Sequence, residues 1–178
     1  PLPVDDTSRF TMFRLTALTA LVSLAGCVTT GERPPQVTQH LATFDTLDFD
    51  VFTNQRWERL HESHAADIKV HWPDGHVTEG LAVHTDDLKA MFVYAPDTRI
   101  KEHPVRIGSG EWTSVIGVME GTFTVPMPVG PGKTIAPTGK AFRLSMSTVG
   151  RWNAQGTMDE EYLFWDNATY MQQLGLGH

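Results

Sequence analysis

The pattern of apolar and polar positions divides the chain into a helical first part and a strand-rich second part. Apolar residues between positions 40 and 64 recur at spacings of three and four, which predicts amphipathic helix. They are Leu41, Phe44, Leu47, Val51, Phe52, Trp57 and Leu60. Asn54 is a plausible N-cap for a second short helix within this stretch. We therefore expect the folded domain to begin near Gln39 with helices.

A short strand and a further helix follow. The segment "DIKVHWPDG" predicts a strand that ends in a Pro-Asp-Gly turn. Helical spacing then returns between positions 80 and 97, at Leu81, Leu88, Met91 and Phe92. We expect Thr85 or Asp86 to cap this helix and Pro96 to end it.

From position 98 the apolar residues alternate, which is typical of strands. Two strands surround the hairpin loop Gly108-Ser109-Gly110, and a second hairpin joins "AFRLSMSTVGRW" to "TMDEEYLFW" through "NAQG". An extended connection rich in Pro and Gly lies between the hairpins, and "NATYMQQLG" predicts a short closing helix. This order predicts an α+β fold with helices on one face of a curved antiparallel sheet. Such a sheet encloses a concave cavity, which is the default position for a binding site.

The first residues have the features of a bacterial lipoprotein signal. From Met12, which we take as the natural initiator, one arginine precedes an apolar run that ends in "LAGC". The run is too short to span a bilayer and fits a signal peptide. We expect residues 1–27 to be upstream residues and signal peptide, with Cys27 lipidated, and 28–38 to be a flexible tether. The domain at 39–178 would then be lipid-anchored in the bacterial cell envelope, on the periplasmic or extracytoplasmic side.

Composition excludes several classes of function. The chain has 178 residues, of which 40% are hydrophobic, and its net charge is −7. That charge argues against a nucleic-acid surface, which needs a basic stripe. The sequence contains no nucleophile elbow, Walker loop, dinucleotide fingerprint or zinc-protease motif. We expect no cofactor.

Four segments, in order along residues 39–176, resemble one known group. They are "HAADIKVHWPDGHVTEG", "GVMEGTFTVPM", "APTGKAF" and the ending "EEYLFWDNATYMQQLGLG". Together they resemble the SnoaL-like polyketide cyclase and ester cyclase family, which has the cone-shaped nuclear-transport-factor-2-like fold. The resemblance implies a cofactor-free aldol closure in which an acid on the last strands removes a proton next to a carbonyl. It also implies a His and a Gln one strand earlier, whereas "FRLSMSTVG" contains Ser145, Ser147 and Thr148 instead.

The last predicted strand carries the candidate acids Asp159, Glu160, Glu161 and Asp166. Alternation places Glu160, Tyr162 and Asp166 on one face, with Met158 and Phe164. It places Glu161 and Trp165 on the other, with Asp159 and Leu163. One carboxylate is therefore expected to face the cavity, where burial would raise its pKa. Asp166 is alternatively the N-cap of the closing helix.

Histidines and aromatics complete the predicted site. His71 and His103 lie in strands, where either could partner a carboxylate. Our candidate catalytic set is Asp166, Glu161, His71 and His103. The pair His61 and His64, with His71 or His84, could bind a metal, but no compact ligand signature completes such a site, so we predict none. The aromatic residues expected to line the pocket are Trp57, Trp72, Tyr162 and Trp165.

Two classes of function remain open. The first is a cofactor-free enzyme of cyclase, isomerase or lyase type acting on a small carbonyl compound. The second is a non-catalytic, lipid-anchored envelope module that binds a small hydrophobic ligand or a protein partner. In this fold the outer face of the sheet often pairs, so we also expect a homodimer. A cavity-lining acid on the last strand would favour the enzyme.

Overall fold

The computed structural model describes residues 34–177. The predicted signal and Cys27 lie outside the described residues. Within residues 34–177 no helix is both long enough and apolar enough to cross a membrane.

The first helical region differs in detail from the prediction. Helix α1 (Pro35–Thr46) begins with proline in its first turn and buries Val37. The expectation that 28–38 is a flexible tether is wrong for its last four residues, because residues 35–38 are helical. The chain then continues into a π-helical segment, η1 (Leu47–Phe52), and a 3-10 helix, η2 (Trp57–Glu62). Asn54 does not cap η2; its Nδ2 atom donates to the Asp50 carbonyl at 2.9 Å.

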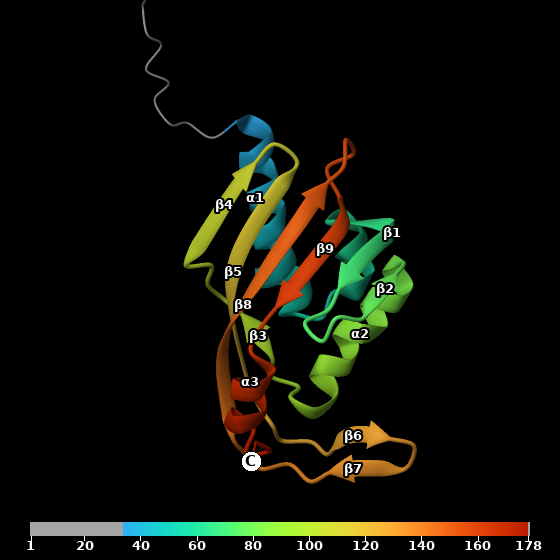
Figure 1. The fold of residues 1–178 in the computed structure, drawn as a ribbon, viewed down its shortest axis with the longest axis vertical. Helices are drawn as coiled ribbons and strands as arrows, with labels where there is room; N and C mark the ends of the chain where they lie inside the picture. The colour runs from blue at the N-terminus through green and yellow to red at the C-terminus, as the bar shows by residue number, and fades with distance from the viewer. Residues whose placement is uncertain (1–33, 178) are drawn as a thin grey trace, which may run out of the picture. The chain divides into compact units, whose positions relative to one another are not determined.

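A seven-stranded sheet forms the body of the domain (Figure 1). Its strands are β1 (His64–His71), β2 (Val77–Glu79), β3 (Arg99–Ile100), β4 (Val105–Ser109), β5 (Trp112–Thr122), β8 (Ala141–Trp152) and β9 (Met158–Phe164). Their order is β2-β1-β9-β8-β5-β3, with β4 also paired to β5. All pairs are antiparallel except β1 with β9, which the meander pattern did not predict. The α+β class and the helix-covered antiparallel sheet are confirmed.

Three further elements complete the fold. Helix α2 (Leu81–Tyr94) begins after Gly80, not at Thr85 or Asp86, and the Thr85 hydroxyl donates back to the Leu81 carbonyl. The connection expected to be merely extended forms a hairpin of β6 (Met127–Gly130) and β7 (Lys133–Ile135), beyond the end of the main sheet (Figure 1). Helix α3 (Asn167–Gln173) closes the chain as predicted.

The core lies between the helices and the inner face of the sheet. Phe44 of α1, Leu88 of α2 and Met119 of β5 are among its buried apolar residues. Strict alternation predicted that Met158 and Glu160 share a face of β9. That prediction is wrong, because the β8–β9 pairing shifts between Arg151 and Trp152. Met158 is therefore buried in the core although Glu160, two residues later, lies on the outer face.

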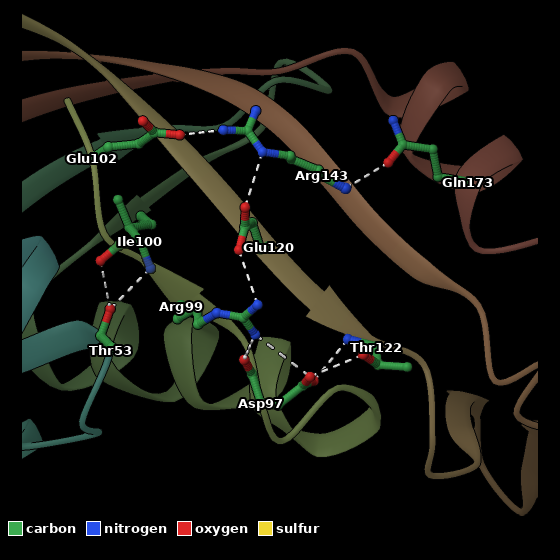
Figure 2. Close-up of polar contacts among 9 residues, drawn as sticks. All are labelled: Thr53, Asp97, Arg99, Ile100, Glu102, Glu120, Thr122, Arg143 and Gln173. Atoms are coloured by element: carbon green, nitrogen blue, oxygen red, sulfur yellow. Dashed lines mark hydrogen bonds and ion pairs between the residues drawn. The ribbon is translucent and has the colours of Figure 1, made fainter. Parts of the chain in front are cut away.

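Charged side chains on the outer face connect β3, β5 and β8 (Figure 2). Glu120 accepts from Arg99 and Arg143, each at 2.9 Å, and Arg143 also contacts Glu102. Close to them, the Thr53 hydroxyl accepts from the Ile100 amide at 2.9 Å and lies 3.0 Å from its carbonyl. These contacts between Thr53 and Ile100 attach the end of η1 to β3, and one residue of η1 belongs to the site described below.

Candidate active site

A cavity lies between η1, α2 and the inner face of the sheet. It has a volume of about 30 Å³, which is room for one water molecule. Its walls are mostly apolar, and the polar residues that line it are Asp48, His64, His84, Thr148 and Glu161. Met91 and Trp165 are the lining residues that are partly exposed, so the cavity is closest to solvent there.

Three polar side chains from three different elements meet at one wall of the cavity. Glu161 of β9 is 4% exposed, and His64 of β1 and His84 of α2 are each 2% exposed. The Glu161 Oε2 atom lies 3.3 Å from His84 Nε2 and 3.7 Å from His64 Nε2. These three atoms all lie within 4.8 Å of one another, so the group could hold a metal ion.

The neighbours of His64 fix the orientation of its ring. Its Nδ1 atom lies 2.9 Å from the Ser63 hydroxyl and 3.3 Å from the Leu60 carbonyl. Ser63 in turn donates to the same carbonyl at 3.2 Å. These contacts leave the Nε2 atom directed at Glu161, without a hydrogen bond.

Burial controls the protonation of the other two groups. It lowers the pKa of His84 to about 4, because the low-dielectric interior disfavours the imidazolium. His84 is therefore neutral at pH 7. Burial acts to raise the pKa of Glu161, but the neighbouring imidazoles of His64 and His84 outweigh it and lower that pKa, so the rise expected from the sequence is wrong. Glu161 is thus available as a carboxylate in an apolar cavity.

A second polar group reaches the cavity through Asp48. Its Oδ2 atom lies 2.8 Å from His103 Nε2, and His103 Nδ1 lies 2.8 Å from Asp45 Oδ1. The His103 side chain is only 1% exposed. Burial raises the pKa of Asp48 above its ordinary value, and the hydrogen bond and charge of His103 offset only part of this effect. Burial alone would lower the pKa of His103, but the two carboxylates more than offset it and raise that pKa.

The local backbone places Asp48 at the cavity. Asp48 belongs to the π-helical segment, a wider turn that often marks functional sites. The Thr53 side chain and amide both contact the Asp48 carbonyl, at 2.8 and 3.2 Å. On the facing strand, Gly117 packs directly against this group: a Cβ atom there would make ordinary contacts with Asp48 Oδ2, at 3.5 Å, and with His103 Cδ2, at 3.6 Å.

The model of one protein family, described as SnoaL-like polyketide cyclase, matches residues 44–174. The chain belongs to the SnoaL-like polyketide cyclase family. The match includes every residue that lines the cavity. No curated protein matches the chain.

Solved structures show the same fold. IdmH from Streptomyces antibioticus, a proposed polyketide cyclase, is 23% identical with a TM-score of 0.66, covering 77% of this chain and 99% of its own. A proposed SnoaL-like polyketide cyclase from Jannaschia sp. CCS1 is 18% identical with a TM-score of 0.70, covering 83% and 99%. A proposed polyketide cyclase from Xanthomonas campestris pv. campestris is 13% identical with a TM-score of 0.66, covering 78% and 98%. At these identities the likeness shows the fold alone.

The four candidate catalytic residues of this SnoaL-like chain lie in different places. Glu161 lines the cavity, and His103 lies behind Asp48 without lining it. His71 lies on the outer face of the sheet, 3.0 Å from Glu160. Asp166 is exposed and caps α3, accepting from the Thr169 amide at 3.1 Å and from its hydroxyl at 2.6 Å. The structure therefore brings neither His71 nor Asp166 to the cavity.

The candidate pocket aromatics are also divided. Trp165 lines the cavity, and Trp72 packs edge-on against it, with ring centroids 6.3 Å apart. Trp57 instead packs against Phe92 in the core, at 5.5 Å. Tyr162 stacks on His71 on the outer face, at 4.0 Å, because alternation in β9 directs it away from Glu161.

The sequence analysis missed Asp48, and it considered His64 and His84 only as metal ligands, in combinations without Glu161. Helical spacing contained the signal, since Asp48 lies four residues from both Phe44 and Phe52. His84 likewise lies three residues after Leu81 and four before Leu88, on the apolar face of its helix. A polar residue on an apolar helical face is a candidate for the interior.

Proposed function

We propose that this protein is a cofactor-free enzyme that carries out acid/base chemistry on a small carbonyl compound, of the cyclase, isomerase or lyase type. Membership of the SnoaL-like family supports this class of reaction. The observation that carries the proposal is Glu161, a buried carboxylate on the last strand that faces an apolar cavity.

The two polar groups of the cavity have complementary properties. Glu161 has a lowered pKa and is ionised, whereas Asp48 has a raised pKa and more readily keeps a proton. Pairs of carboxyl groups whose environments separate their pKa values are typical of acid and base partners. In the proposed reaction, Glu161 takes a proton from the carbon next to the carbonyl, and the electron pair of that C–H bond forms an enolate. Asp48, which is paired with His103 in the resting protein, takes up the proton that His103 releases and donates a hydrogen bond to the enolate oxygen.

The fate of the enolate distinguishes the reaction types. In an isomerisation, Glu161 returns the proton to a different carbon of the same conjugated system. In a cyclisation, the enolate carbon attacks a second carbonyl of the same molecule, and the resulting alkoxide takes up the proton. Both routes balance without an added oxidant or reductant.

A substrate needs more space than the closed cavity provides. Pockets for small molecules have volumes of about 300–1,000 Å³, whereas this one has about 30 Å³. The partly exposed lining residues Met91 and Trp165 are the side chains that must move first. We propose that they form the entrance.

The small volume also favours a second candidate function. A non-catalytic envelope module that binds a protein partner needs no internal space, and its buried acids would then be structural. With the predicted anchor at Cys27, the domain would bind a small hydrophobic ligand or a partner at the membrane surface. The two proposals differ in whether the interior carboxylate exchanges protons with a ligand.

Proton exchange into deuterated water tests the enzyme directly. A panel of small β-dicarbonyl compounds is incubated with the protein, and loss of the carbon-bound proton signal is followed by NMR. Wild type should accelerate exchange of at least one compound. Glu161→Gln should lower that rate by about 10²–10⁴-fold, the usual contribution of a positioned base.

Glu160→Gln is the matched control, because Glu160 is adjacent on the same strand but lies on the outer face beside His71. It should exchange as fast as wild type. Equal rates in Glu161→Gln would exclude Glu161 as the base. A wild-type protein inactive on every compound would favour the non-catalytic module.

We also propose that the domain forms a homodimer through the outer face of its sheet. Ile107, Trp112 and Phe164 are 58%, 40% and 53% exposed. The β4–β5, β5–β8 and β8–β9 registers place them on that same face. Light scattering of the described domain should give twice the monomer mass; a monomer at high concentration would contradict this.

A further inference from the structure

We propose that His64, His84 and Glu161 form a binding site for a first-row transition metal ion of the Zn²⁺ class. The site goes beyond the proposed function, because binding requires no substrate and no reaction. Its ligands come from β1, α2 and β9, which meet only in the folded domain. No short sequence motif could therefore contain them.

The spacing of the three atoms is close to that of a tetrahedral zinc site. Ligands about 2.0–2.1 Å from Zn²⁺ lie about 3.3–3.4 Å from one another in tetrahedral geometry. Glu161 Oε2 is already 3.3 Å from His84 Nε2 and 3.7 Å from His64 Nε2, and all three atoms lie within 4.8 Å.

Two buried polar atoms of the group have no hydrogen-bond partner. They are His64 Nε2 and Glu161 Oε2, which lie 3.7 Å apart. A buried polar atom without a hydrogen bond is unfavourable, so two of them facing each other need an explanation. A metal ion between them would satisfy both, because it accepts an electron pair from each.

The support around His64 is typical of a metal-binding histidine. Such residues usually donate their second ring N–H to a carbonyl or another acceptor, which directs the free nitrogen at the metal. Here Nδ1 lies beside the Ser63 hydroxyl and the Leu60 carbonyl, and Nε2 faces Glu161. His84 Nε2 faces the same carboxylate, 3.3 Å from Glu161 Oε2.

The ligand set determines which ions fit. Two imidazoles and one carboxylate suit Zn²⁺, Fe²⁺, Co²⁺ or Ni²⁺, whereas Mg²⁺ and Ca²⁺ prefer oxygen ligands. The adjoining cavity has room for one water molecule, which would occupy the fourth position. An ion on Glu161 Oε2 would withdraw the electron pair that the proposed proton transfer needs. Metal-loaded protein should therefore be inactive in the exchange reaction.

Metal binding is tested on the full chain after removal of metals with a chelator. Calorimetric titration should show one Zn²⁺ per chain and no binding of Mg²⁺. Co²⁺ should give the intense visible absorption of a four-coordinate site. X-ray absorption of the Zn²⁺ protein should show two imidazole ligands, a measurement that requires no variant. Absence of stoichiometric Zn²⁺ binding, or a spectrum without two imidazoles, would overturn the site.

Variants identify the ligands. Glu161→Gln and His84→Gln should each weaken Zn²⁺ binding by at least about 100-fold. Ser63→Ala, which removes the hydroxyl beside His64 Nδ1 and no proposed ligand, should weaken it about 10–100-fold. His71→Gln is the control for adventitious binding at the half-buried His71–Glu160 pair on the outer face. It should leave the affinity unchanged. If His71→Gln removes binding and Glu161→Gln does not, the interior site is wrong.

The result of the metal-binding experiments does not depend on whether the protein has the proposed enzyme activity. Circular dichroism establishes that each variant is folded before titration, and wild-type absorption data stand even if a variant is not. A protein that binds no metal but exchanges protons would leave the proposed function intact. A protein that binds metal but exchanges no protons would retain the metal site alone.

Discussion

Replacing His103 with glutamine should destabilise the domain strongly. His103 lies between two carboxylates, 2.8 Å from Asp48 Oδ2 and 2.8 Å from Asp45 Oδ1. The Asp48 side chain is 9% exposed, so His103→Gln leaves a buried charge without its cation. Removing one member of a buried ion pair typically lowers the free energy of unfolding by about 3–5 kcal/mol. We expect a loss in that range near pH 6.

The pH dependence follows from the raised pKa of His103. Because its folded pKa lies above the ordinary value of 6.5, its stabilising contribution is fully present at pH 6.5 and just below it. The contribution is lost as the pH rises through the folded pKa. The difference in unfolding free energy between wild type and His103→Gln should therefore shrink as the pH is raised above 6.5.

Urea unfolding, followed by circular dichroism at several pH values, measures this difference. Asp45→Asn is the control, because the Asp45 side chain is 26% exposed and its other oxygen is paired with Arg106. It should cost no more than about 1 kcal/mol. The double variant Asp48→Asn with His103→Gln should lose less than the sum of the single losses, since no charge is left stranded. If His103→Gln costs no more than Asp45→Asn, the Asp48–His103 pair is not ionic and the reasoning fails.

Three other predictions address the closing helix, the entrance and the anchor. Asp166→Ala removes the N-cap of α3 and should cost about 1 kcal/mol without changing proton exchange; a loss of exchange at unchanged stability would make Asp166 functional instead. Trp165→Ala should widen the cavity entrance and increase the binding of a small apolar fluorescent dye, while Trp57→Ala, in the core, should not. Cys27→Ser should release the protein from the membrane fraction, and unchanged association would contradict the lipoprotein prediction.

Much of the fold could be read from local patterns in the sequence. Helical spacing predicted the region of α1 and η1, and alternation with turn residues predicted the β4–β5 and β8–β9 hairpins. These features depend on neighbours along the chain, so the sequence contains them directly. Alternation in the last strand likewise predicted that one carboxylate would be on the inner face, but it could not choose between Glu161 and Glu160.

Tertiary structure decided that choice and assembled the site. The bulge in β9 buries both Met158 and Glu161, which a strict period of two would separate. His64 and His84 meet Glu161 only because β1 pairs in parallel with β9 while α2 packs against the same face. Contacts between residues far apart in the chain depend on strand pairing and helix packing, and the protonation of buried groups depends on the desolvation that packing produces. The spacing of residues along the sequence predicts neither these long-range contacts nor the protonation of the buried groups.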